Sequence, residues 1–164
     1  IEHCGITDDD IIRRIKEQGM VPIPNPRFIH LNGDRYIEFY GERVEMMFPL
    51  KSFLDAGVTC AIGTDCSVVP ENPMLGIASA VSRKSSKGTD VGVRQAVSVM
   101  EAIRMYTYNG AYGSFAEDRL GSIETGKLAD MVIASDEILS ASAEKIEQMR
   151  CIMTMVDGKI VYQE

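Results

Sequence analysis

The amino-acid sequence predicts an α/β fold in which short parallel strands are covered by helices. The predicted strands 1–4, 20–24 and 58–63 are short and mainly apolar, and helical patterns lie between them. Gly19 and Gly57 each end a helix directly before a strand, which is the order expected when helices cover a parallel sheet. Three strands do not close a barrel.

The helices are predicted from capping residues and apolar spacing. Thr7 is the expected N-cap of the first, and the aspartates at 8–10 lie in its first turn, where the helix dipole favours negative charge. Pro73 is expected to open a later helix. Further helical patterns span residues 46–54, 72–81 and 94–108. The polar stretch 84–90 is predicted to be a loop, and the prolines of 20–24 suit a strand end but not a central ladder position.

From residue 117 onward the pattern changes from helical to extended. Extended segments follow at 120–123 and 129–134 and in a hairpin of 152–156 with 159–162. Asp157 and Gly158 supply the positive φ angles that a tight hairpin turn requires. The sequence therefore divides into an α/β part, 1–116, and a small β-rich part, 117–164.

Composition excludes several classes of protein. The 164 residues carry 17 Lys and Arg against 24 Asp and Glu, a net charge of −7, so nucleic acid and anionic membranes are not expected partners. No apolar window is long enough for a membrane span, and the first residues lack a signal-peptide pattern. The four cysteines do not have zinc-ribbon spacing, and we expect them to be reduced in a cytoplasmic protein. Walker, dinucleotide-binding and GxSxG motifs are absent.

Two residues lie where a parallel α/β sheet presents its chemistry, at strand ends. His3 is near the end of the first predicted strand, and Asp65 follows the third. An imidazole and a carboxylate are common ligands of a divalent metal that activates water, and the carboxylate can accept the proton of that water. The alternatives are a structural histidine and a capping or turn-forming aspartate.

Three further polar residues have less distinctive positions. His30 is predicted to lie in a Pro-rich loop, where a surface role is the simpler interpretation. Arg43 and Arg83 are candidates for binding an anionic group of a substrate, although exposed helix surfaces carry such residues routinely.

Several motifs together resemble a known family. They are 1–4 (IEHC), 49–57 (PLKSFLDAG), 63–65 (GTD), 106–112 (YTYNGAY), 120–130 (LGSIETGKLAD) and the closing hairpin 156–161 (VDGKIV). In this order they resemble the C-terminal part of the metal-dependent amidohydrolase superfamily, in the branch that includes N-substituted formamide deformylases. The resemblance covers essentially the whole chain.

The resemblance implies the C-terminal portion of a (β/α)₈ TIM barrel, with strands six to eight, plus strands of a small β-sandwich. His3 matches the sixth-strand histidine, 20–25 the seventh strand, and Asp65 the eighth-strand aspartate. A divalent metal, with zinc as the expected ion, is implied with His3 and Asp65 as ligands and Asp65 as the catalytic base. Since a full barrel takes about 250 residues and a catalytic metal three protein ligands, the chain is expected to be a fragment with an incomplete site.

The implied activity is hydrolysis of a C–N bond, in an amide, formamide or cyclic amide, by metal-activated water. The implied partner is a small amide-type molecule, and a homodimer is left open. A non-catalytic α/β interaction module derived from the same fold is the alternative, and a deaminase is a further one, because a fold does not determine its reaction. The isolated fragment is expected to be inactive.

Overall fold

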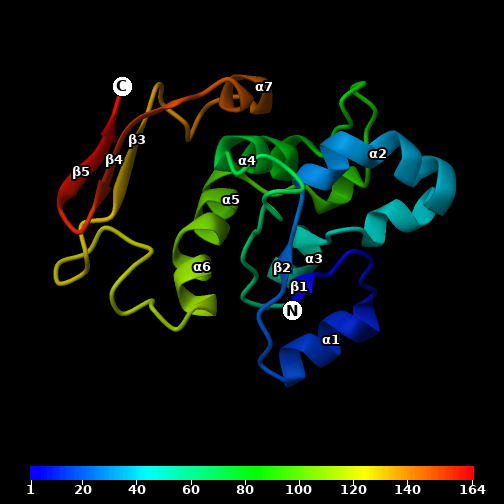
Figure 1. Ribbon diagram of the computed structural model, residues 1–164. Coiled ribbons are helices and arrows are strands. Elements are labelled where there is room, and N and C mark those ends of the chain that lie inside the picture. Colours follow the sequence, from blue (N-terminus) through cyan, green and yellow to red (C-terminus); the bar gives the residue numbers. More distant parts are fainter.

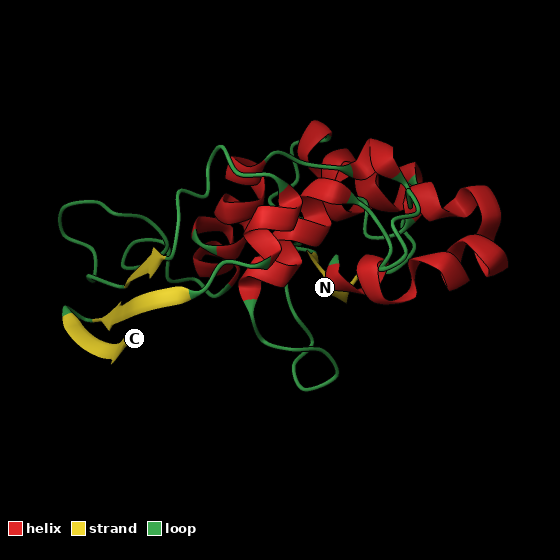
Figure 2. Cartoon of the chain, turned by 90° about the horizontal axis from the view of Figure 1, so that it is seen from above, coloured by secondary structure: helices red, strands yellow, loops and turns green.

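The computed structural model describes residues 1–164 as a mixed α/β protein. The α-helices are α1 (Asp9–Glu17), α2 (Arg27–Tyr40), α3 (Leu50–Asp55), α4 (Pro73–Ser82), α5 (Val99–Tyr106), α6 (Tyr108–Gly113) and α7 (Ala143–Glu147), and 3₁₀ turns are η1 (Gly41–Met46) and η2 (Val93–Gln95). The strands are β1 (Glu2–His3), β2 (Ile23–Pro24), β3 (Met131–Ala134), β4 (Cys151–Val156) and β5 (Lys159–Gln163). The sheet of β3, β4 and β5 stands to one side of the helices in two perpendicular views (Figures 1 and 2). None of the helices has the length and apolar character needed to cross a membrane.

A small parallel sheet lies among the helices. β1 pairs with β2 in parallel, with His3 opposite Pro24. The segment 58–63 runs along the other side of β2, because the Ala61 N–H donates to Pro22 O at 3.0 Å and the Gly63 N–H to Pro24 O at 3.1 Å. The expectation that the prolines would keep this strand out of a central position is therefore wrong. β2 is central, but neither proline has an N–H to return a bond to 58–63, so pairing on that side is one-directional.

The helix starts follow local capping chemistry, with one correction. The N-cap of α1 is Asp8, whose carboxylate accepts from the Ile11 N–H at 2.9 Å, whereas the Thr7 hydroxyl donates to Cys4 O at 3.1 Å. Helix α4 begins at Pro73 as predicted. A single helix over 94–108 is not formed, because the chain makes η2 and then starts α5 anew from a capping box at Ser98.

Helix α2 replaces the loop predicted around His30. Its 14 residues include Ile29, which is fully buried, and Gly33, which packs closely on the segment 85–91. A Cβ at Gly33 would lie 2.7 Å from Val91 Cγ2, so the glycine permits this approach of helix and loop. His30 is thus a helical residue.

The main core joins α1, α3, α4, α5 and the segment 58–63. Ile146 and Met149, which follow residue 117 in sequence, are also buried in it, because α7 packs on α4. The division between residues 1–116 and 117–164 remains a prediction. Helix α7 belongs to the second of these parts by sequence but packs against the first.

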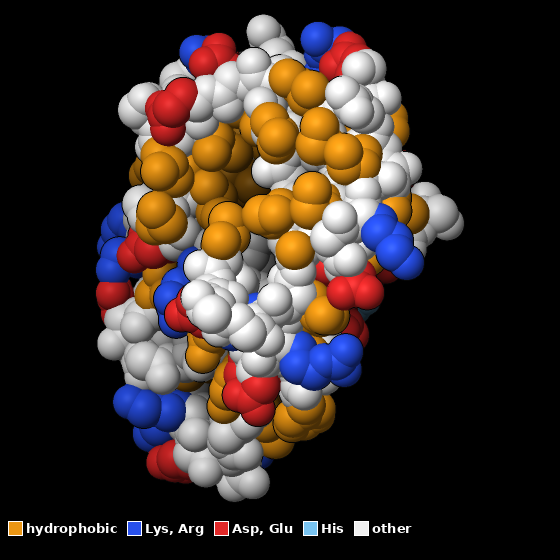
Figure 3. Space-filling model, turned by 90° about the vertical axis from the view of Figure 1, so that its left-hand side faces the viewer, with side chains coloured by type: hydrophobic (Ala, Val, Ile, Leu, Met, Phe, Trp, Pro, Cys, Tyr) orange, Lys and Arg blue, Asp and Glu red, His pale blue; other side chains and the backbone are white.

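The predicted closing hairpin is present as β4 and β5, and its turn residues Asp157 and Gly158 have φ angles of 48° and 73°. Neighbouring residues of a strand point to opposite faces of the sheet. Val132 is 58% exposed and Ile133 is 52% exposed, so neither face of the sheet is covered at β3. Viewed from the side of this sheet, hydrophobic side chains gather around a hollow (Figure 3).

Candidate functional site

The carboxyl ends of three parallel segments meet at one edge of the small sheet. His3 ends β1, Asn25 directly follows β2, and Asp65 comes two residues after Gly63, which is bonded to the end of β2. His3, Cys4 and Asp65 have φ angles of 65°, 44° and 65°. Such left-handed conformations are unfavourable for residues with a side chain and gather at functional sites.

A hydrogen bond links the ends of β1 and β2. His3 Nδ1 lies 2.7 Å from Asn25 Oδ1, and Asn25 is only 1% exposed although His3 itself is exposed. Gly63 approaches from the other side, where a Cβ would lie 3.1 Å from Asn25 Nδ2. Sequence reasoning did not single out Asn25. The available signal was an amide residue at the end of the predicted strand 20–24, level with His3.

The carboxylate of Asp65 is half-buried and has no hydrogen bond or ion pair within the protein. Its backbone carbonyl accepts from the Val68 N–H at 2.8 Å, which begins the turn that follows. The backbone makes this turn while the carboxylate stays available, so Asp65 does not act as a side-chain cap here.

The donor set at this edge consists of His3 and Asp65. No group of three His, Cys, Asp or Glu side chains in the structure is arranged to hold a metal ion. Burial raises the pKa of the half-buried Cys4 thiol, so this thiol is not activated as a nucleophile. All four cysteines are free thiols.

Arg83 has a structural role, which corrects its candidacy for substrate binding. It is fully buried, and its guanidinium donates to the carbonyls of Met47, Phe48, Val91 and Gly92 at 2.9–3.2 Å. Burial lowers its pKa to about 10, so it remains a cation at neutral pH. Arg43 is exposed on η1 and makes no ion pair. Its role in substrate binding stays a prediction.

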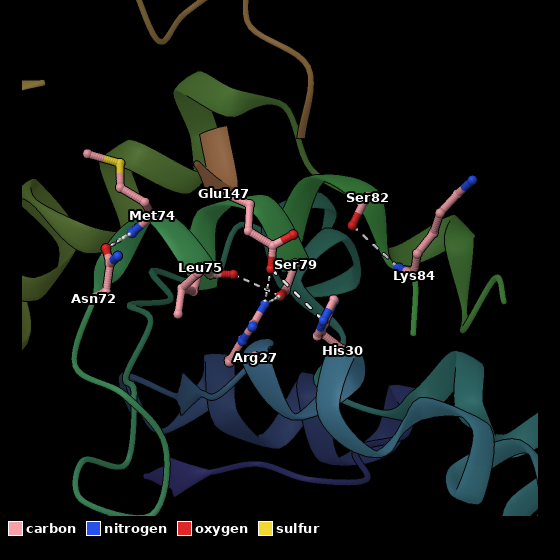
Figure 4. Close-up of polar contacts among 9 residues, drawn as sticks. All are labelled: Arg27, His30, Asn72, Met74, Leu75, Ser79, Ser82, Lys84 and Glu147. Carbon is pink, nitrogen blue, oxygen red and sulfur yellow. Dashed lines mark hydrogen bonds and ion pairs between the residues drawn. The ribbon is translucent and has the colours of Figure 1, made fainter. Parts of the chain in front are cut away.

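His30 belongs to a polar cluster that joins three helices. Arg27 Nη1 donates to Glu147 Oε1 at 2.8 Å and lies 3.4 Å from Ser79 Oγ, while His30 Nε2 is 3.9 Å from Glu147 Oε1 (Figure 4). Burial, and next the charge of Arg27, lower the pKa of His30, whereas Glu147 opposes the shift. A cavity of about 180 Å³ borders this cluster.

Neither this cavity nor a second hollow of about 480 Å³ beside Glu71 and Tyr162 includes His3, Asn25 or Asp65. At the strand edge, His3 is exposed and Asp65 is half-buried. The cluster around Arg27 is best explained as packing of α7 onto α2 and α4.

The fold and this edge together define an α/β protein whose parallel strands present a histidine, a buried amide and a carboxylate at their carboxyl ends. The chain matches the amidohydrolase family over residues 1–162, and it belongs to that family.

Two comparisons give the family context. The chain is 29% identical over 165 residues to an N-substituted formamide deformylase of Arthrobacter pascens, covering 99% of this chain and 30% of the relative. It is similar to the crystal structure of a metal-dependent hydrolase from Pyrococcus horikoshii, with a TM-score of 0.75, 29% identity, and coverage of 88% of this chain and 30% of that one.

A zinc-bound adenosine deaminase from Xanthomonas campestris has the same fold, with a TM-score of 0.71 at 22% identity, and the match covers 99% of this chain and 36% of that one. The chain thus spans about a third of the length of the proteins it matches.

Proposed function

We propose that this chain is the C-terminal part of a metal-dependent hydrolase that cleaves a C–N bond in a small amide, formamide or cyclic amide. The observation that carries the proposal is the strand edge, where Asp65 offers a carboxylate without a protein partner at the same end of the sheet as the hydrogen-bonded His3. Support comes from the family and from the formamide deformylase that is similar over nearly the whole chain.

The three parallel segments then correspond to strands six, seven and eight of a (β/α)₈ barrel. Residues 1–116 belong to that barrel, and residues 117–164 contribute strands to a small β-sandwich. The uncovered sheet of β3, β4 and β5 is consistent with this division, because apolar residues on both of its faces lack a covering layer.

The residues present fit part of a divalent-metal site. His3 has a ring nitrogen, Nε2, without a protein partner, and Asp65 supplies a free carboxylate, so these two would hold the ion. Zinc is the proposed ion, since imidazole and carboxylate are among its usual ligands. A bound cation of this kind supplies Lewis-acid polarisation of a carbonyl and lowers the pKa of water. Remaining ligands would come from other strands of the barrel.

The proposed catalytic residue is Asp65. Its carboxylate accepts a proton from the attacking water and passes it to the nitrogen of the leaving amine, so the C–N bond breaks with a neutral leaving group. Arg43 is proposed to bind an anionic part of the substrate.

The test is Asp65→Asn in the full-length protein, assayed for amine release from N-substituted formamides, linear amides and cyclic amides. The amide keeps the shape but cannot accept a proton, so turnover is expected to fall by roughly 10²- to 10⁴-fold with the fold intact. Asp118→Asn, at an exposed aspartate away from the site, is the matched control.

A variant Asp65→Asn that keeps more than half of the normal turnover number refutes the role of Asp65. If the unmodified protein releases no amine from any substrate of the panel and binds no divalent cation, the alternative is favoured, namely a non-catalytic interaction module.

A further inference from the structure

The hydrogen bond between His3 and Asn25 determines which ring nitrogen carries the proton. An amide oxygen can only accept, so a contact of 2.7 Å between Nδ1 and Oδ1 requires the hydrogen to be on Nδ1. A neutral imidazole carries a single N–H, and Nε2 is then left with a free lone pair.

The backbone of Asn25 is fixed on both sides, and its side chain is buried. Asn25 stands between Pro24 and Pro26, which are fully buried and have restricted φ angles. Its backbone carbonyl accepts from the Phe28 N–H at 3.1 Å at the entry to α2. Gly63 lies against Nδ2, where a Cβ would lie 3.1 Å from it, a tight contact. The buried side chain is therefore preorganised, while the exposed His3 ring is the part that needs orientation.

We infer that Asn25 is a positioning residue that keeps His3 in the Nδ1–H tautomer and presents its unprotonated Nε2 at the strand edge. The tautomer of His3 does not depend on the proposed function. Only the ligand that Nε2 binds, a divalent cation, rests on it. Partners that hydrogen-bond the second nitrogen of a metal-binding histidine typically change metal affinity by 10- to 100-fold.

The tautomer can be measured directly by long-range ¹H–¹⁵N NMR on the ¹⁵N-labelled chain. The chain has only two histidines, so His30→Gln assigns the His3 signals, and His30 serves as an internal control. In a mildly alkaline buffer we expect the Nδ1–H form for His3. Asn25→Leu is expected to shift His3 to the Nε2–H form, and Asn25→Asp, which keeps an accepting oxygen, to retain Nδ1–H.

An Nε2–H form of His3 in the unmodified chain overturns the inference without any variant, so the test survives if Asn25→Leu does not fold. Retention of Nδ1–H in a folded Asn25→Leu chain overturns it as well. The dispersion of the amide spectrum and unchanged His30 signals show whether the variant is folded.

The second readout is cation affinity of the full-length protein, measured by competition with a chromophoric chelator and Zn²⁺. Asn25→Leu is expected to weaken Zn²⁺ binding by roughly 10- to 100-fold, with recovery in Asn25→Asp. Unchanged affinity in Asn25→Leu contradicts the positioning role. Turnover that survives Asp65→Asn would refute the proposed function. That result would not change the tautomer measured for His3.

Discussion

Replacement of Arg83 by methionine should strongly destabilise the protein, because four backbone carbonyls share this one buried side chain. Two of the four keep another donor, since Phe48 O also accepts from the Leu50 N–H and Gly92 O from the Gln95 N–H. Met47 O and Val91 O lose the donor that Arg83 supplies.

Each buried carbonyl left without a partner costs about 1–3 kcal/mol. The two orphaned carbonyls therefore predict a loss of about 2–6 kcal/mol in the free energy of unfolding for Arg83→Met. The left-handed φ of 51° at this position is present in both proteins and does not contribute to the difference. The free energy of unfolding of Arg83→Lys should lie between those of the unmodified protein and Arg83→Met, because one ammonium cannot reach all of the carbonyls.

The assay is urea-induced unfolding followed by circular dichroism. Arg94→Met is the control, because the Arg94 side chain is 80% exposed and its contact with Glu45 is at 3.5 Å. We expect this control within about 0.5 kcal/mol of the unmodified protein. If Arg83→Met costs less than about 1 kcal/mol, the carbonyls find other donors and the reasoning from unsatisfied groups is wrong.

Three other outcomes are expected. A Cβ at Gly76 would lie 1.8 Å from the Tyr106 hydroxyl, which is buried without a partner, so Gly76→Ala should destabilise and Tyr106→Phe should relieve part of that loss in a double-mutant cycle followed by thermal melting. Because the pKa of His30 is lowered in the folded state, chiefly by burial, the unfolded chain takes up this proton first as pH falls below about 6.5. The free energy of unfolding should therefore decrease from pH 7 to pH 5, with a smaller decrease in His30→Gln; an equal decrease in both would contradict the assignment. Finally, the purified 164-residue chain should not hydrolyse the amide panel, and turnover that co-purifies with it and disappears in Asp65→Asn would show a complete site.

Local signals predicted much of the fold. The hairpin of β4 and β5 follows from Asp157 and Gly158, because few residues adopt two successive positive φ angles easily. Pro73 marked the start of α4 because its missing N–H is not needed in the first turn. The same chemistry explains the missed α2. Pro26 directly precedes its first residue, but three closely spaced prolines indicated a loop.

Long-range contacts account for what the sequence did not reveal. The four carbonyls around Arg83 lie 8, 9, 35 and 36 positions away in the sequence, so nothing local distinguishes Arg83 from the exposed Arg43. For the candidate site, His3 and Asp65 were singled out by their places after strands, and their roles remain predictions. Asn25 was missed because its importance depends on lying level with His3 across a strand pair.

The prolines of β2 also affect how the strand edge opens. Since Pro22 and Pro24 donate nothing to the segment 58–63, two amides, those of Ala61 and Gly63, join that segment to β2. Its other side is fastened by the Asn109 Nδ2–H, which donates to Cys60 O at 2.7 Å, and by the Ile62 N–H, which donates to Met105 O at 3.4 Å. Because Val58, Cys60 and Ile62 are also buried in the main core, separating this segment and Asp65 from β2 requires an opening that breaks these bonds and exposes those side chains. Amide hydrogen exchange at Ala61 and Gly63 would therefore report, without substrate or metal, how much of the time the two halves of the candidate site are together.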